Sequence, residues 1–204
     1  MFVETSSCRE RLTGWEHGGM NPRSEFGVGD GPVRIDSYDR SWPVRFEEER
    51  RVLEKTLGDA ITGGVHHVGS TSVPGLDAKP VIDILVGVDN LDSAHAYIEP
   101  LAGVGYMYSP YRPNEMLWFC KPNPAHRTHH LHLVPTDSPR FKAELVFRDY
   151  LRTHPGAAKE YAALKRQLAA QFEHDREAYT EAKADFIQEI LERAMGDGDH
   201  GSDP

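Results

Sequence analysis

Residues 81–88 read Val-Ile-Asp-Ile-Leu-Val-Gly-Val, a run of aliphatic side chains that a single acid interrupts. A nearly continuous β-branched run of this length is typical of a central strand that is buried on both faces of a sheet. Asp83 stands out within it, because a buried carboxylate needs a hydrogen-bonding partner or a metal ion. The run therefore predicts both the centre of the fold and the position of a functional acid.

A hydroxyl-rich turn precedes this strand. It follows a strand predicted over 60–68 and consists of Gly69, Ser70, Thr71 and Ser72. Glycine lets the backbone turn sharply, and hydroxyls beside backbone N–H groups can bind phosphate, although Ser/Thr clusters also cap helices where no ligand is present. Lys79 lies in the loop before Asp83 and is either a phosphate-neutralising residue or an ordinary loop lysine. A phosphate cradle beside an acid predicts a site where Mg²⁺ meets a nucleoside triphosphate.

The rest of the chain predicts a mixed sheet with helices concentrated at the C-terminal end. Besides the two strands above, hydrophobic periodicity predicts strands over 33–36, 105–108, 116–121 and 129–134. It predicts helices over 41–57, 92–101, 141–151, 155–172 and 176–195. Strands first and helices last, with one early βα unit, indicate an α/β (α+β) fold in which a helical layer covers the sheet.

Composition and charge limit the class of protein. A chain of 204 residues has room for one ordinary domain, which we place at 32–195, between a mobile tail at 1–31 and a disordered acidic tail at 196–204. The formal charge of −9 argues against duplex DNA or an anionic membrane as a partner. Cys8 and Cys120 are too few for a disulfide framework, and no apolar stretch or leader-like start stands out, so we expect a cytoplasmic protein.

Several motifs resemble those of the GrpB family, also called UPF0157. They are Gly-Ser-Thr-Ser-Val-Pro-Gly-Leu at 69–76, His-Leu-His at 130–132, Tyr-Asp-Arg-Ser-Trp-Pro at 38–43 and Phe-Arg-Asp-Tyr-Leu-Arg at 147–152. The resemblance covers most of 33–191 and implies the fold of the DNA-polymerase-β-like nucleotidyltransferases. His66 is a small departure, because an acid is commoner before the histidine of the family, which here is His67.

The turn, its spacing to Asp83 and the nearby cations predict a set of functional residues. Those expected to bind the nucleotide or its phosphates are His67, Gly69, Ser70, Thr71, Ser72, Lys79 and Arg148. The wider superfamily carries a second acid two residues after the first, but this chain has Leu85 there. The pair that holds two Mg²⁺ ions is therefore incomplete, as is typical of GrpB-like sequences.

Two histidines extend the predicted site. His130 and His132 are two residues apart, so on a strand they point to the same face, whereas His129 points to the other. If their strand lies beside the strand of Asp83, the three side chains can bind a metal ion, or one imidazole can act as a general base. Simple packing within the sheet is the alternative. The expected metal is Mg²⁺ or Mn²⁺, with a transition metal as the other choice.

Several cationic residues remain open to two interpretations. Lys121 and Arg127 flank the histidine strand and either bind an anion or lie on the surface. Arg148 either pairs with Asp149 or reaches the ligand. Two Tyr–Lys pairs have a spacing of four residues, so each pair shares a helix face and either lines the site or packs on the surface. These pairs are Tyr161 with Lys165 and Tyr179 with Lys183.

Three functions fit the sequence. The first is a metal- and nucleotide-dependent transferase that acts on a small-molecule acceptor, with Asp83, His130 and His132 as catalytic and metal-binding residues. The second is an enzyme with a single transition metal on the same three residues and no nucleotide chemistry. The third is a non-catalytic ligand-binding protein that has lost the second carboxylate.

Overall fold

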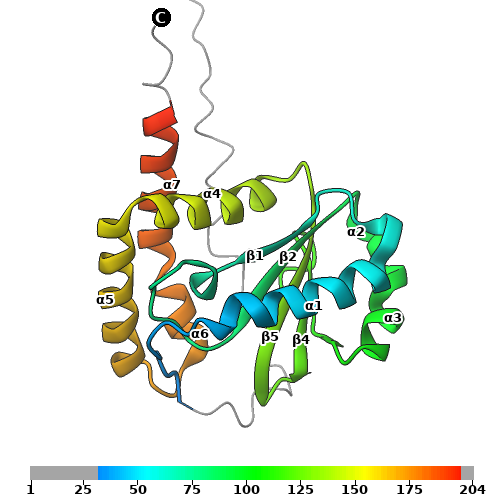
Figure 1. The fold of residues 1–204 in the computed structure, drawn as a ribbon, viewed down its shortest axis with the longest axis horizontal. Coiled ribbons are helices and arrows are strands. Elements are labelled where there is room, and N and C mark those ends of the chain that lie inside the picture. Colours follow the sequence, from blue (N-terminus) through cyan, green and yellow to red (C-terminus); the bar gives the residue numbers. More distant parts are fainter. Residues whose placement is uncertain (1–31, 199–204) are drawn as a thin grey trace, which may run out of the picture.

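The protein is described by a computed structural model that covers residues 32–198, with side chains described to 196. The predicted tail at 1–31 and most of the predicted tail at 196–204 lie outside this range. The described chain forms one mixed sheet with the strand order β1-β2-β5-β4-β3 (Figure 1). Its strands are β1 Val65–Val68, β2 Ile82–Val88, β3 Met107–Tyr108, β4 Leu117–Asn123 and β5 His126–Pro135.

Strand β2 lies at the centre of the functional half of the sheet. It is antiparallel to β1 and parallel to β5, and β5 is in turn antiparallel to β4. Its side chains alternate between two apolar clusters, one on each face, which explains the continuous aliphatic run in the sequence. The prediction of a central strand around Asp83 is therefore confirmed.

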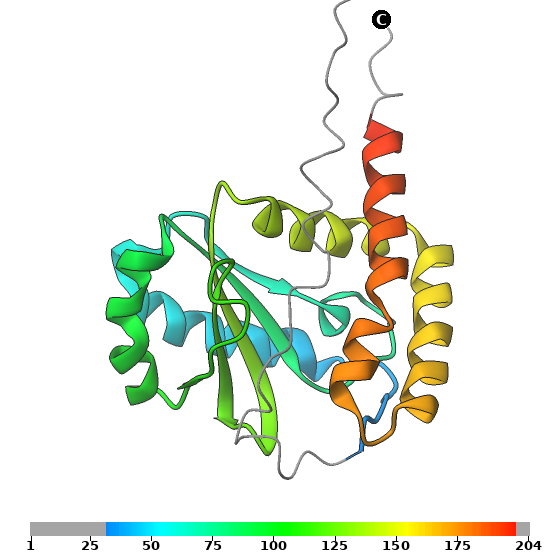
Figure 2. The same ribbon diagram turned by 180° about the vertical axis from the view of Figure 1, so that it is seen from behind.

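Helices cover both faces of the sheet. On one face lie α1 Ser41–Leu57, α2 Leu91–Ala94 and α3 Ile98–Gly103, and Figure 1 shows α1 crossing in front of the strands. Seen from behind in Figure 2, the other side carries α4 and the C-terminal helices. The helices of this second layer are α4 Pro139–Thr153, α5 Pro155–Gln171, α6 Arg176–Glu181 and α7 Ala184–Gly198.

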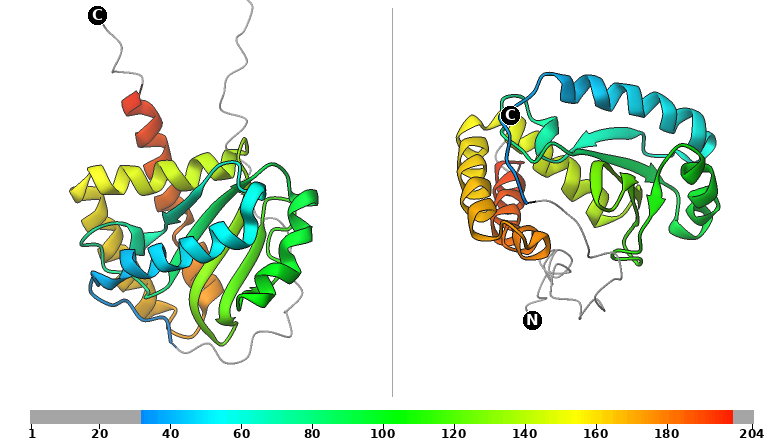
Figure 3. Two further views of the ribbon diagram at one scale, coloured as in Figure 1. Left: turned by 45° about the vertical axis from the view of Figure 1, so that its right-hand side comes forward. Right: turned by 90° about the horizontal axis from the view of Figure 1, so that it is seen from below.

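The largest apolar core lies between α1 and the sheet. It joins Trp42, Phe46 and Leu53 of α1 to the aliphatic side chains of β2 and β5. A smaller core on the opposite face joins Leu85 to Phe141 of α4. Figure 3 shows the sheet between α1 on one side and α4 with the C-terminal helices on the other. The layered arrangement predicted from the sequence is confirmed.

Four predicted elements differ from the structure. Residues 33–36 form only an isolated bridge from Asp36 to Ala78, and the strand predicted over 60–68 begins at Val65. The helix predicted over 92–101 is divided into short segments, because Pro100 has no N–H to continue the helical hydrogen bonds. The last predicted helix is divided into α6 and α7, and the division places Lys183 at the junction.

No helix within residues 32–198 is long and apolar enough to cross a membrane.

Candidate functional site

Asp83 and His130 meet across neighbouring strands. Their Cα positions are paired in the parallel β2–β5 register, so their side chains leave the same face of the sheet. His130 Nδ1 lies 2.9 Å from Asp83 Oδ1, which is a hydrogen bond. The side chain of Asp83 is 28% exposed, so the carboxylate also reaches solvent. The predicted meeting of these two residues is what the structure shows.

The charge states of this pair follow from burial and hydrogen bonding. Burial raises the pKa of Asp83, but the hydrogen bond from His130 and the positive charges around it outweigh burial and hold the pKa below its usual value. Burial lowers the pKa of His130 despite the neighbouring carboxylate. At neutral pH His130 is therefore an uncharged imidazole that donates its Nδ1–H to an ionised Asp83. Its Nε2 atom is buried and has no hydrogen-bonding partner among the described residues.

Gly69 brings the backbone directly against Asp83. Its φ of 67° lies in the left-handed region, and a β-carbon there would overlap Asp83 Oδ2. Ser70–Ser72 then form a short 3₁₀ turn. The glycine predicted for a close approach therefore has that role, toward the carboxylate rather than toward a phosphate.

Two of the three hydroxyls in the turn serve the turn itself. Thr71 Oγ1 donates to the Val81 carbonyl oxygen at 3.1 Å, and Ser72 Oγ donates to the Gly69 carbonyl oxygen at 2.6 Å. Both side chains are buried and their hydroxyls stabilise the turn, while phosphate binding by Thr71 and Ser72 stays a prediction. Ser70 is half-buried and hydrogen-bonds to the Tyr161 hydroxyl, which places it on the Asp83 side.

His67 lies on the other face of the sheet from Asp83. Its ring stacks on Phe46 of α1 with a centroid distance of 4.8 Å, and its Nε2 lies 3.0 Å from Thr71 Oγ1. Because the Thr71 hydroxyl donates elsewhere, His67 Nε2 is the donor in this bond. Burial lowers the pKa of His67 to about 4, so the ring is uncharged at pH 7. The strand alternation directs His67 to α1, so it does not lie beside Asp83, and its binding of phosphate stays a prediction.

His132 contacts Glu144, whereas His130 contacts Asp83. Its Nδ1 lies 3.2 Å from Glu144 Oε2 of α4, and Glu144 in turn pairs with Arg140 at 3.0 Å. Within the described residues, no three His, Cys, Asp or Glu side chains are arranged to hold a metal ion. The predicted metal triad of Asp83, His130 and His132 is therefore not formed, since each imidazole points its Nδ1 at its own carboxylate.

Two lysines, Lys165 of α5 and Lys183 at the junction of α6 and α7, face the Asp83 side of the sheet. The side chain of Lys165 is almost fully buried, donates to the Asp77 carbonyl oxygen at 2.6 Å and lies over the Tyr161 ring. Burial and the neighbouring Lys183 lower the pKa of Lys165 to about 7. Burial lowers the pKa of Lys183 to about 8, and its ammonium group lies 4.3 Å from the centroid of Tyr179. For both lysines the negative charge of Asp83 acts against burial and raises the pKa.

These side chains form a group that we call the Asp83 cluster. It consists of Asp83, His130, Ser70, Tyr161, Lys165, Tyr179 and Lys183. The four-residue spacing of the two Tyr–Lys pairs indicated in the sequence that each pair shares a helix face. The alternative that these pairs pack on the surface is wrong, because Tyr161, Lys165 and Tyr179 are buried. Lys79 lowers the pKa of His130 through its charge, so it also lies near the cluster.

The two residues that flank the histidine strand have structural contacts. Lys121 forms an ion pair with the buried Glu49 of α1 at 2.8 Å, on the face opposite Asp83. The guanidinium of Arg127 lies 5.1 Å from the centroid of Trp118. His129 lies near Glu49 and Arg45, on the same face as Lys121 and opposite Asp83.

Two arginines of α4 hold the turn from outside. Arg148 Nη1 donates to the His67 carbonyl oxygen at 3.4 Å, and it also pairs with Asp149 as the sequence indicated. Arg152 donates to the Ser72 carbonyl oxygen from Nε at 3.1 Å and from Nη2 at 2.9 Å. These carbonyls lie on either side of Gly69–Thr71, so α4 fixes both ends of the turn. Arg152 was not singled out in the sequence.

The fold and the cluster define a mixed-sheet α/β protein with a carboxylate–imidazole pair among buried cations. Residues 32–193 match the family model described as GrpB protein. A UPF0157 protein of Pseudomonas aeruginosa is 40% identical over 172 residues, which are 81% of this chain and 69% of that protein. The glutamate-rich protein GrpB of Alkalihalophilus pseudofirmus is 34% identical over 81% of this chain and 98% of its own length. The chain therefore belongs to the GrpB family.

The chain is also similar to a solved structure and to part of a second group of proteins. The crystal structure of the conserved protein GrpB from Enterococcus faecalis has a TM-score of 0.73 and 34% identity, covering 80% of this chain and 98% of that one. A dephospho-CoA kinase of Mycolicibacterium paratuberculosis is 28% identical over 80% of this chain, but the match spans 46% of that protein. The Gly-x₄-Gly-Lys-Ser/Thr motif of a phosphate-binding P-loop does not occur in this sequence.

Proposed function

We propose that this protein binds a phosphate-bearing small molecule, a nucleoside triphosphate in particular, at the Asp83 cluster and transfers a group from it to a small acceptor. The observation that carries the proposal is the charge of the cluster: Lys165 and Lys183 are gathered around one partly exposed carboxylate. Keeping a buried and a partly buried ammonium group beside a single acid costs folding free energy, and an anionic ligand offsets that cost. The nucleotidyltransferase-like fold belongs to the same proposal.

Each group in the cluster has a role in this proposal. Lys165 and Lys183 bind phosphate oxygens, and the hydroxyl of Ser70 orients the phosphate groups. Asp83 holds His130 by its Nδ1–H, and the buried Nε2 is the atom that would accept a proton from the hydroxyl or amine of the acceptor once the acceptor displaces the side chains that cover it. The same orientation of a base by a buried acid is used in hydrolase triads. A cytoplasmic location, where nucleotides are abundant, is part of the proposal.

The residues present do not fit a resident metal centre. Asp83 is a single carboxylate, one of its oxygens already binds His130, and His132 is held by Glu144. Leu85, at the position of the second acid, is fully buried in an apolar cluster. Mg²⁺ generally binds through one or two carboxylates together with substrate phosphates, so a divalent ion would arrive with the nucleotide.

Calorimetric titration tests the proposal. Nucleoside triphosphates are titrated with and without Mg²⁺ at pH 8, in two buffers with different ionisation enthalpies. Because an anion favours the charged form of lysines whose pKa is about 7 and about 8, binding should take up protons from the buffer. Lys183→Gln should weaken binding about tenfold or more. The matched control is Lys159→Gln, an exposed lysine on α5, which should bind like the wild type.

Two results contradict the proposal. One is that none of the nucleoside triphosphates binds. The other is equal affinity in the wild type, in Lys183→Gln and in Lys165→Gln, which would place any nucleotide elsewhere.

A ligand-binding protein without turnover is the second candidate, because buried Leu85 removes the two-metal route. Release of pyrophosphate from a bound nucleotide, measured over a panel of hydroxyl and amine acceptors, separates the two candidates. Turnover that is lost in His130→Gln supports the transferase. Tight binding with no turnover over the panel supports the second candidate.

A further inference from the structure

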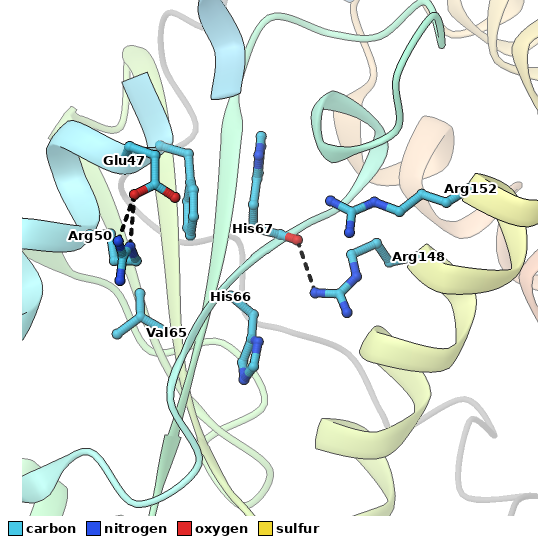
Figure 4. Close-up of a pocket in the computed structure, with 8 residues that line it drawn as sticks. Glu47, Arg50, Val65, His66, His67, Arg148 and Arg152 are labelled. Atoms are coloured by element: carbon cyan, nitrogen blue, oxygen red, sulfur yellow. Dashed lines mark hydrogen bonds and ion pairs between the residues drawn. The ribbon is translucent and has the colours of Figure 1, made fainter. Parts of the chain in front are cut away.

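A second candidate site lies at the outer edge of β1, away from the Asp83 cluster. A groove of about 320 Å³ lies there between α1 and α4. Figure 4 shows Arg148 and Arg152 pointing toward β1 from one side, with the Glu47–Arg50 pair of α1 across from them. The described residues that line it are Phe46, Glu47, Arg50, Val65, His66, His67, Arg148 and Arg152.

The groove is separate from the Asp83 cluster. Strand β1 pairs with β2 on one side, and the carbonyl of His67 points outward to Arg148 on the other. The ring of His67 faces α1, whereas Asp83 and Val68, which are paired in the register, face α4 and its core. No residue of the Asp83 cluster as defined above lines the groove.

The groove is locally cationic on a chain that is acidic as a whole. Three arginines line it, and Glu47 is the one acid among the described residues of its wall. Glu47 is already paired with Arg50 at 2.7 Å, so the charge of Arg148 and Arg152 is the excess, and exposed Asp149 offsets part of it. The net charge of the whole sequence is −9, so this concentration of guanidinium groups runs against the composition. A guanidinium pair of this kind matches the geometry of phosphate oxygens.

The two arginines of α4 also retain donors for a ligand. A guanidinium carries five N–H donors, and Arg152 uses Nε and Nη2 on the Ser72 carbonyl, while its Nη1 lies 3.9 Å from Asp149. Arg148 donates from Nε and Nη2 to Asp149 at 2.7 and 2.9 Å, and its bond from Nη1 to the His67 carbonyl is long, at 3.4 Å. The second N–H of Nη1 and the second N–H of Nη2 are the donors that Arg148 can offer to a ligand. The side chain of Arg152 is 38% exposed, so a solute can reach it.

We propose that this groove is a binding site for a small oxyanion, namely phosphate or the phosphate group of an ester, held by Arg148 and Arg152. The arginines also hold the carbonyls of His67 and Ser72 on either side of the turn that contacts Asp83. A bound oxyanion competes with those carbonyls for the guanidinium donors, so occupancy of the groove changes the position of the turn. The groove thereby couples anion concentration to the Asp83 cluster, and its binding of anions does not depend on the function proposed for that cluster.

Anion titrations of matched variants test this inference. Inorganic phosphate, pyrophosphate and a nucleoside monophosphate are titrated by calorimetry at low ionic strength, so that free phosphate and phosphate esters are distinguished. Arg152→Gln should weaken binding about tenfold. Glu47→Gln, which removes the acid of the wall, should strengthen it about threefold. The control Arg193→Gln changes an arginine of α7 with a similar exposure, 43%, and should bind like the wild type.

The Asp83→Asn variant separates this site from the Asp83 cluster. Anion binding at the groove should persist in Asp83→Asn and in Lys183→Gln. The inference is overturned if none of the three anions binds, or if Arg148→Gln and Arg152→Gln both bind like the wild type while Lys183→Gln does not. Circular dichroism confirms the fold of each variant, and Glu47→Gln keeps the inference testable if an arginine variant does not fold.

Discussion

Asp83 occupies a position where an aliphatic residue is expected, and its neighbours explain how the strand tolerates it. The Nδ1–H of His130 satisfies one carboxylate oxygen, and Gly69 leaves space for the other. That hydrogen bond from His130, together with the charges of His132 and Lys183, outweighs burial and holds the pKa of Asp83 below its usual value. A buried charge that has both a hydrogen-bonding partner and nearby opposite charge remains ionised instead of shifting its pKa upward. The acid could thus be identified from the sequence, but its environment could not.

The sequence left Lys165 open to a surface position, but the structure buries this lysine almost completely. Its pKa falls from 10.5 in the unfolded chain to about 7 in the folded protein, so between these values the unfolded chain binds a proton that the folded chain does not. The free energy of unfolding therefore increases with pH in this window. We expect the wild type to gain about 2 kcal/mol relative to Lys165→Met between pH 7 and pH 9, measured by urea denaturation.

The matched control is Lys159→Met on the same helix, where the lysine is exposed. Its free energy of unfolding should follow the pH dependence of the wild type. A constant difference between the wild type and Lys165→Met over this pH range would show that Lys165 is protonated in the folded protein, contrary to the cluster described above.

Helix α4 connects the sheet, the turn and the groove. Its polar side chains at a spacing of four residues lie on one helix face, and each has a defined partner. They are Arg140 with Glu115, Glu144 with His132, Arg148 with the His67 carbonyl and Arg152 with the Ser72 carbonyl. This repeat was available in the sequence, where only Arg148 was recognised. The helix therefore positions functional residues as well as covering the sheet.

Glu144 should contribute to stability in a pH-dependent way. Burial raises its pKa, but His132 and Arg140 outweigh burial and lower the pKa in the folded protein. Its stabilising effect is therefore present above pH 4.5 and is lost as the pH falls further. We expect Glu144→Gln to lower the free energy of unfolding at pH 7 by about 2 kcal/mol, and the loss to shrink toward pH 3.

Chemical denaturation at pH 7 and at pH 3.5 measures this difference. Glu160→Gln on α5 is the control, because that carboxylate is 61% exposed and its removal should change little at either pH. A loss for Glu144→Gln that is equal at both pH values would mean that the ionised carboxylate contributes nothing to the contact with His132.

The sheet and the C-terminal helices are joined through a shared apolar cluster. Val73 and Leu76, which follow the turn, pack with Leu151 of α4, Tyr161 of α5 and Ile190 of α7. The loop between β1 and β2 is therefore part of the same packing as the helical layer. We infer that both layers unfold together, as a single cooperative unit.

Ile190→Ala tests the cooperativity of the whole domain. The side chain is fully buried, so its truncation should lower the free energy of unfolding by about 3 kcal/mol. In urea, the far-ultraviolet circular dichroism and the tryptophan fluorescence should shift to the same lower midpoint, because Trp42 packs against the sheet and Trp118 belongs to β4. Circular dichroism that shifts while fluorescence does not would show that the helical layer unfolds separately. The matched control is Val146→Ala, at an exposed position of α4.

Local patterns in the chain were sufficient for the central strand, the long helices and the position of the acid. Period and β-branched composition are properties of neighbouring residues, so they can be recognised without the fold. The helix breaks before Pro100 and near Lys183 are harder to place from the sequence, because a helix end depends on hydrogen bonds and packing with distant segments. The motifs around Gly69 and His130 were enough to indicate the family.

The tertiary structure alone decides which side chains from distant parts of the sequence pair with one another. Alternation along a strand predicted that His130 and His132 share a face, but the position of α4 assigned Glu144 to one and left Asp83 to the other. In the same way, the burial of Lys165 and the partial burial of Lys183 depend on where α5 and the junction of α6 and α7 pack, which no local pattern encodes. The pKa of a side chain and its partner are set by groups far away in the sequence, because electrostatic and hydrogen-bonding energies depend on distance in space.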